Sequence, residues 1–171
     1  MKKALLLFFF VSLVTFAQTQ KVGYVNTQTI MEQYSGAIAA QAKIDNIVSA
    51  LTKERDQLTQ GLQTAYDNYQ KQQGTMTEEK KAQVQQELVK KQQEIQQFEQ
   101  VKFAQPNGEI YVKNEEIMVP VRNNVKAAID AVAKDMGYNF IFDKSSDVLL
   151  LYADDSFDIT LEVLLKLKKS K

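Results

Sequence analysis

The sequence predicts an α+β protein in which a long coiled-coil hairpin projects from a small body of β-strands and helices. Three observations support this fold class. Residues 41–100 are rich in glutamine and carry apolar residues at steps of three and four, the spacing of a helical stripe. Residues 21–26 are β-branched and aromatic, which is typical of a strand. The tail, 109–171, mixes helical and strand-like patterns.

The N-terminus has the pattern of a secretory signal peptide. Lys2 and Lys3 precede an apolar run that is followed by Thr15-Phe16-Ala17, which ends in a small residue suited to cleavage. The run is about ten residues long, shorter than the roughly 20 that a membrane-spanning helix needs. We therefore expect residues 1–17 to be a cleaved signal peptide and the mature chain to be exported to the periplasm. An uncleaved membrane anchor is the alternative.

The composition argues against an enzyme and against several kinds of partner. The chain has no cysteine and no histidine, so it lacks disulfides and also the commonest metal ligand and general base. Without Lys2 and Lys3, 19 basic residues remain against 21 acidic residues, a net charge of −2. This balance provides no basic footprint for nucleic acid. We expect no catalytic site, no cofactor, no metal and no nucleic-acid partner.

The first elements lead from a strand into the arm. The strand is expected at Lys21–Asn26, and Asn26 is placed to cap the helix that follows. Ser35 is a candidate cap for the next helix. Residues 37–103 then form the arm, two antiparallel helices that pack along one seam with Leu62 facing Leu88. The seam residues are Ile47, Leu51, Leu58, Leu62, Val84, Leu88, Ile95 and Phe98.

The turn between the arm helices is expected at residues 73–79. Gly74 suits the left-handed conformation that ends a helix, and Thr75 with Glu78 has capping-box spacing. Gly61 lies at a stutter in the apolar repeat, which predicts a soft point in the first arm helix. Since the arm buries few large side chains, we expect it to be helical and flexible.

Residues 18–36 and 104–171 are expected to form a discontinuous body. A break at 104–108 ends the arm, and a helix that contains Pro120 follows and stops at Gly137. Strands are expected at 138–143 and 148–152, joined as a hairpin, before a last short helix. The core or subunit-contact residues should be Val22, Tyr24, Phe140, Phe142, Leu149 and Leu151.

The body is expected to associate with copies of itself. Residues 148–151 are apolar on both alternating faces, which indicates burial on both sides of a sheet. Two helices can cover only one of these faces, and a closed cyclic oligomer would cover the other and hide the strand edges. A monomer with a two-layer α/β core is the alternative.

The chain resembles the Skp/OmpH family of periplasmic chaperones for outer-membrane proteins. Pro106-Asn107-Gly108 and Pro120 fall where members of that family often have such residues. Four motifs carry most of the resemblance: Lys-Val-Gly-Tyr-Val-Asn-Thr at 21–27, Thr-Glu-Glu at 77–79, Gly-Tyr-Asn-Phe-Ile-Phe-Asp-Lys at 137–144 and Leu-Tyr-Ala-Asp-Asp-Ser-Phe-Asp-Ile-Thr at 151–160.

The resemblance implies a jellyfish-like homotrimer whose body is the trimerisation unit and whose three arms enclose a cavity. Unfolded outer-membrane proteins would be held there without ATP, protected from aggregation before membrane insertion. Several family members are strongly basic and have a lipopolysaccharide site built from arm lysines and arginines. In this chain the arm carries acids about as often as bases, so we do not carry that site over.

Four apolar residues of the arm lie off the seam and are candidate client contacts: Val48, Tyr66, Met76 and Val89. Their alternative interpretation is as isolated exposed apolar residues, which are common. The acidic run at 154–155 is interpreted as turn and capping residues. The alternative function is a structural periplasmic spacer or adaptor that binds a fixed protein partner at the arm tip.

Overall fold

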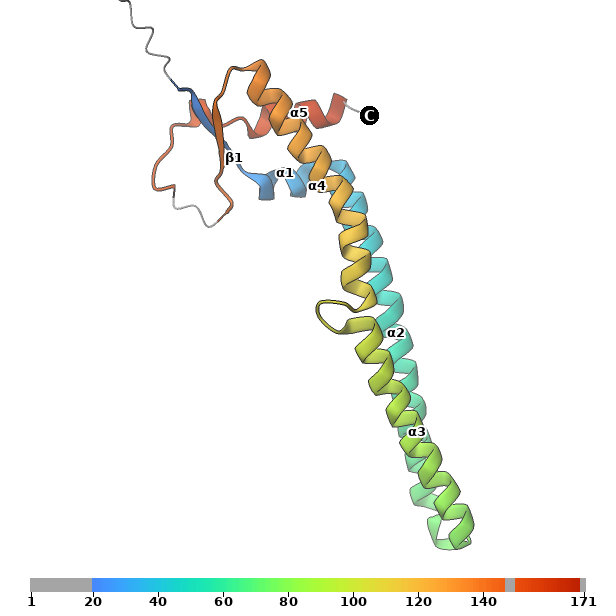
Figure 1. Ribbon diagram of the computed structural model, residues 1–171. Helices are drawn as coiled ribbons and strands as arrows, with labels where there is room; N and C mark the ends of the chain where they lie inside the picture. The colour runs from blue at the N-terminus through green and yellow to red at the C-terminus, as the bar shows by residue number, and fades with distance from the viewer. Residues whose placement is uncertain (1–19, 147–149, 170–171) are drawn as a thin grey trace, which may run out of the picture.

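A computed structural model describes residues 20–146 and 150–169. The predicted signal peptide and one predicted body residue, Leu149, lie outside these ranges. The described chain forms a long helical arm with a small body at one end (Figure 1). The predicted α+β class is therefore confirmed, with helices far outweighing a small sheet.

The arm is built on one long helix, α2 (Ser35–Gln72), of 38 residues. At 1.5 Å per residue it extends about 57 Å. A 3-10 turn, η1 (Gln73–Thr75), reverses the chain, and α3 (Glu78–Phe103) returns beside α2 (Figure 1).

Two predictions about the tip of the arm are wrong. The residue that caps α3 is Thr77, whose side chain accepts a hydrogen bond from the Lys80 N–H at 3.3 Å. Thr75 belongs to the 3-10 turn instead, because that turn takes up three residues before the helix starts. Gly74 also does not adopt a positive φ angle, so the turn uses no left-handed residue there.

The return limb of the arm consists of two helices. After the break at residues 104–108, α4 (Glu109–Asp135) runs along the part of α2 nearest the body (Figure 1). Lys102 and Glu109 form an ion pair across the break. Ala37 and Ala40 of α2 pack against Val121 of α4. The chain therefore breaks at residues 104–108, but the return limb continues to pack against α2 after this break.

A two-stranded parallel sheet lies in the body. Strand β1 (Val22–Val25) pairs with β2 (Phe140–Asp143), with Val22 opposite Phe140 and Tyr24 opposite Phe142. The predicted hairpin partner of β2 is not seen, since residues 150–152 have no regular structure. A 3-10 turn, η2 (Asp155–Phe157), leads instead to a bridge between Asp158 and Tyr24 and then to α5 (Thr160–Lys169).

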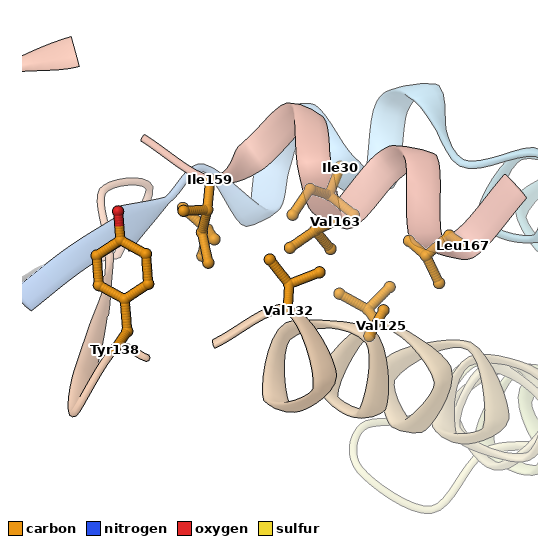
Figure 2. Packing of buried hydrophobic residues seen from close by; sticks show 9 residues of the cluster. Ile30, Val125, Val132, Tyr138, Ile159, Val163 and Leu167 are labelled. Atoms are coloured by element: carbon orange, nitrogen blue, oxygen red, sulfur yellow. The ribbon is translucent and has the colours of Figure 1, made fainter. Parts of the chain in front are cut away.

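The core of the body lies between α4 and α5, with α1 (Thr27–Gln33) and β1 closing its sides (Figure 2). Val163 and Leu167 present one face of α5 to this core, and Ile159, just before the helix, continues the same spacing of four. Tyr138 covers the end next to β1, where it leaves no room for a side chain on Gly23: a Cβ there would lie 2.7 Å from the ring. The core therefore joins both ends of the chain to α4.

The N-terminal cap of α1 is as predicted, and that of α2 is not. Asn26 accepts a hydrogen bond from the Thr29 N–H at 3.0 Å. Ser35, by contrast, is the first residue of α2, and the cap position is held by Tyr34, which makes no side-chain capping bond. The Tyr34 ring folds over Gly36, where a Cβ would lie 2.5 Å from it. The first turn of α2 is therefore covered by this ring and has no side-chain cap.

Asp143 fastens the end of β2 to the start of α1. Its carboxylate accepts hydrogen bonds from the N–H and hydroxyl of Thr27 and from the N–H and hydroxyl of Ser145. Burial opposes ionisation of this carboxylate, but the hydrogen bonds outweigh it and lower the pKa of Asp143 below its ordinary value. The ionised form is therefore the one that stabilises the folded body.

We expect Asp143→Asn to lower the free energy of unfolding at neutral pH by about 1.5–3 kcal/mol, the range for hydrogen bonds to a charged group. Because the folded pKa is lowered, the contribution is complete above the unfolded value of about 3.9 and is lost as pH falls through the folded pKa. Urea titrations of both proteins at neutral and acidic pH measure this. A gap that stays constant down to acidic pH would contradict the assignment.

Candidate functional site

The first candidate surface is the outward face of the sheet. Val22, Phe140 and Phe142 are 42%, 52% and 44% exposed, and Leu151 is 86% exposed. Of the described residues predicted for the body, Tyr24 alone is buried. The other four are exposed and so lie outside the core of a single chain, which was one of the two roles predicted for them. Their role as subunit contacts stays a prediction.

The same face has an open edge and a groove. Within residues 20–146 and 150–169, β2 pairs with no strand other than β1, so its second edge offers unpaired N–H and C=O groups. A groove of about 710 Å³ runs over this face. Its apolar lining comes from Val22, Tyr24, Phe142, Leu150, Tyr152 and Phe157. An aromatic face with an unpaired strand edge is a surface suited to binding a partner.

The second candidate surface is the arm, whose seam is thin. Leu51 is buried and the other seven predicted seam residues are half-buried, while α3 has no buried residue. At its body-side end, α3 contacts α2 through Phe103, whose ring centre lies 5.6 Å from the Arg55 guanidinium. The Phe98 ring of α3 lies 6.2 Å from the Phe103 ring. Most of α3 thus buries little side-chain surface against α2.

A groove between α2 and α3 lies toward the tip. We call it the arm groove. Leu62 and Leu88, which were predicted to face each other, both line it. Tyr66 and Val89, two of the four candidate client contacts, line it as well and are 47% and 53% exposed. The remaining lining residues are Gln63, Tyr69, Gln85 and Gln92.

Hydrogen bonds fix the tyrosines of the arm groove. Tyr69 Oη accepts a hydrogen bond from Gln85 Nε2 at 2.8 Å, which joins α2 to α3. Tyr66 Oη accepts one from Gln70 Nε2 at 2.9 Å, one turn along α2. Both phenol rings are therefore held in place by their polar ends, with their apolar faces left for contact.

The other two candidate client contacts do not join this groove. Val48 and Met76 are half-buried, Val48 toward the body and Met76 at the tip. Further exposed apolar residues, which sequence analysis did not identify, occur along the return limb and at the base of α2: Ile38, Val101, Val112 and Val119. The arm thus presents scattered apolar side chains over its length.

Charges on the arm are balanced. Helices α2 and α3 carry four and five basic residues, and four and five acidic residues, so their summed charge is zero. Lys81, in one of the cationic pairs of α3, donates a hydrogen bond to Glu78 at 2.7 Å, which raises the pKa of Lys81. The arm therefore exerts no strong long-range field on either sign of charge.

The acidic run after residue 153 serves the turn, as predicted. Asp154 accepts a hydrogen bond from the Ser156 N–H at 2.9 Å, and bonding to Ser156 lowers the pKa of Asp154. Asp158 accepts one from the Thr160 N–H at the start of α5. Burial, followed by the negative charges of Asp158 and Asp155, raises the pKa of Tyr24. These carboxylates order the loop that covers Tyr24.

Over the described ranges, no three histidine, cysteine, aspartate or glutamate residues group together as a metal site would require. Across the same residues, every helix is too short or too polar to span a bilayer.

Comparisons with known proteins agree with this geometry. Residues 21–167 match the family described as outer membrane protein, OmpH-like. The fold is similar to the crystal structure of an OmpH-like protein of Caulobacter crescentus CB15, itself proposed to be an outer membrane chaperone. The TM-score is 0.76 at 15% sequence identity, over 89% of this chain and 86% of that one. At this identity the likeness shows the fold. A comparison with curated protein sequences found no match.

Proposed function

The chain belongs to the OmpH-like family, and from this premise we propose that it is an ATP-independent periplasmic holdase chaperone. It binds unfolded outer-membrane proteins between its arms and prevents their aggregation before membrane insertion. Membership of the family supports the general role of an outer-membrane chaperone. The holdase mechanism, the periplasmic location after signal cleavage and the homotrimer are parts of the proposal.

The outward sheet face supports the assembly that this mechanism requires. A single arm cannot enclose a client, whereas several arms fixed to one hub can. Phe140, Phe142 and the open edge of β2 would meet the same elements of neighbouring copies, which buries aromatic area and pairs the edge. We propose three copies, the number that the family resemblance implies.

The arm supports weak and reversible holding, and this observation carries the proposal. α3 runs for 26 residues without one buried side chain, so the arm buries little of itself and exposes apolar side chains over its length. An unfolded β-barrel exposes alternating apolar residues and unpaired strands that otherwise aggregate. Many small contacts shield such a chain and still release it without nucleotide.

We expect the mature protein to keep an unfolded outer-membrane β-barrel soluble at a near-stoichiometric ratio in the absence of nucleotide. The barrel is diluted from urea into buffer with and without the protein, and aggregation is followed by light scattering. An unrelated helical protein at equal mass is the control. The same rate of aggregation with and without the protein would refute the proposal.

Deleting the tip of the arm separates this function from that of a spacer or adaptor. Removal of residues 70–81 takes away η1 and the helix ends on either side of it. A holdase that makes contacts over the whole arm loses only part of its protection, because the rest of the arm remains. A spacer that docks a fixed partner at the tip loses its binding completely.

A further inference from the structure

The arm groove is suited to an uncharged ligand. Its eight lining residues include no aspartate, glutamate, lysine or arginine, although α2 and α3 together carry 18 charged residues, nine of each sign. The groove measures about 650 Å³, within the roughly 300–1,000 Å³ of known binding pockets. A charged segment would lose hydration there and find no opposite charge among the lining residues, so the groove discriminates against it.

The spacing of the groove fits an extended polypeptide. Leu62 and Tyr66 are four residues apart on α2, which places them about 6 Å apart along the helix axis. Side chains on one face of a β-strand repeat every two residues, about 6.6 Å. Two successive side chains from one face of an extended segment can therefore contact Leu62 and Tyr66 in turn, with Leu88 and Val89 of α3 opposite.

An amide is free to bind the backbone of such a segment. Among the residues that the structure describes, Gln92 makes no side-chain hydrogen bond, and its amide carries both a donor and an acceptor. An extended chain exposes unpaired N–H and C=O groups that need such partners. The neighbouring Gln63 and Gln85 are already engaged, with Asp67 at 2.8 Å and Tyr69 at 2.8 Å. Gln92 is thus the polar contact point.

We propose that the arm groove binds a short extended segment without charged side chains, in which apolar residues alternate with small polar ones. A membrane-spanning strand of an unfolded outer-membrane barrel has this alternation, so the inference rests on the proposed function and identifies which part of the client this site takes. Leu62, Tyr66, Leu88 and Val89 receive its apolar face, and the Gln92 amide receives its backbone. The arm then recognises the alternation of apolar and polar residues in the client rather than its overall charge.

The test uses paired variants of the mature protein. Tyr66→Ser with Val89→Ser removes two exposed walls of the groove, whereas Ile38→Ser with Val101→Ser removes equally exposed apolar residues elsewhere, at 53% and 54% exposure. Three short fluorescent peptides serve as probes. In the alternating peptide, apolar and polar residues alternate; the blocked peptide has the same residues in one apolar and one polar block; the lysine peptide alternates but has lysine at the polar positions. Fluorescence anisotropy measures peptide binding, and the barrel assay runs in parallel.

We expect the groove variant to bind the alternating peptide at least about tenfold more weakly than the wild type, the effect of losing two buried apolar contacts. The control variant changes binding less than about twofold, and the blocked and lysine peptides bind the wild type more weakly. The inference is overturned if both variants lose binding equally, or if all three peptides bind the wild type equally. In either case the proposed function still holds, provided that the wild type keeps the barrel soluble. Failure of the wild type on the barrel overturns both.

A different occupant of the groove is detected by mass. If another copy of the chain fills it, light scattering shows a smaller assembly for the groove variant than for the control variant, and the proposal is overturned. If the assemblies match and the tenfold loss is seen, the extended segment is the occupant.

Discussion

Phe142→Asp should convert the assembled protein into single chains. The side chain is 44% exposed on the outward sheet face, opposite Tyr24 in the parallel register and next to the open edge of β2. Burying a phenylalanine between subunits contributes about 1.5–3 kcal/mol, and burying an unpaired carboxylate costs several kcal/mol more. Since each copy carries the change, association weakens by at least about a thousandfold, or roughly 4 kcal/mol.

Light scattering coupled to size exclusion measures this change as a fall in mass to that of one mature chain. Tyr66→Asp is the matched control, because Tyr66 is exposed to a similar extent, 47%, on the arm. Circular dichroism should be the same for both variants, since neither residue lies in the protomer core. An assembled Phe142→Asp protein, or a wild type that is already a single chain, would rule out this face as the subunit contact.

Loss of assembly should also remove chaperone activity, and this links the face to function. The Phe142→Asp chain keeps an intact arm, including the arm groove, but its arm no longer has neighbours with which to enclose a client. We therefore expect the single chain to bind the alternating peptide and yet fail to keep a barrel soluble. Binding of the peptide would then need only one arm, whereas protection of the barrel from aggregation would need the assembly.

The sequence predicted the long elements well, because their signals are cooperative over many residues. The stripe of seam residues identified the arm, and Gly137, at φ 70°, ends the return limb as expected. Asn26 caps α1 as predicted, by accepting a hydrogen bond from the Thr29 N–H. Near the tip, Thr75 and Thr77 both lie three residues before a helical position, and the local pattern could not decide between them.

Side-chain pattern could not separate the protomer core from a subunit contact, because both are apolar. Phe140 and Phe142 were predicted as core or contact residues, and they lie outside the core of the chain. The true core uses Ile159, Val163 and Leu167, whose spacing of four was present in the sequence. A spacing of four over so short a segment is weak evidence for a buried helix face, because only three residues carry it.

The candidate client contacts illustrate the same limit at the arm. Tyr66 and Val89 were identified because they fall off the seam, but their position in one groove follows from the pairing of α2 with α3 about the turn. A hydrogen bond from Gln85 to Tyr69 joins the two helices at this pairing. Periodicity together with the expected turn predicted that Leu62 faces Leu88, and both line the groove. It did not predict the polar contact between Tyr69 and Gln85, 16 positions apart.

Ile30→Ala should be the most destabilising single truncation in the body. Ile30 is fully buried and packs in the cluster that includes Val25, Val132 and Val163 (Figure 2). Truncating a buried isoleucine to alanine costs about 2–5 kcal/mol, a large share of the roughly 5–15 kcal/mol that stabilises a typical domain. The cavity would lie where α1 meets α4 and α5, so the loss falls on the contacts that hold the arm to the body.

Hydrogen exchange is the appropriate measurement, because the arm helices dominate circular dichroism and would conceal a change confined to the body. Exchange of β1 and α5 amides should accelerate in Ile30→Ala, at one fixed protein concentration, since association also affects stability. Ile38→Ala is the matched control: both changes replace isoleucine within a helix, but Ile38 is 53% exposed, so we expect an effect within about 0.5 kcal/mol. Equal protection of body amides in the two variants would mean that the cluster around Ile30 does not unite the two ends of the chain.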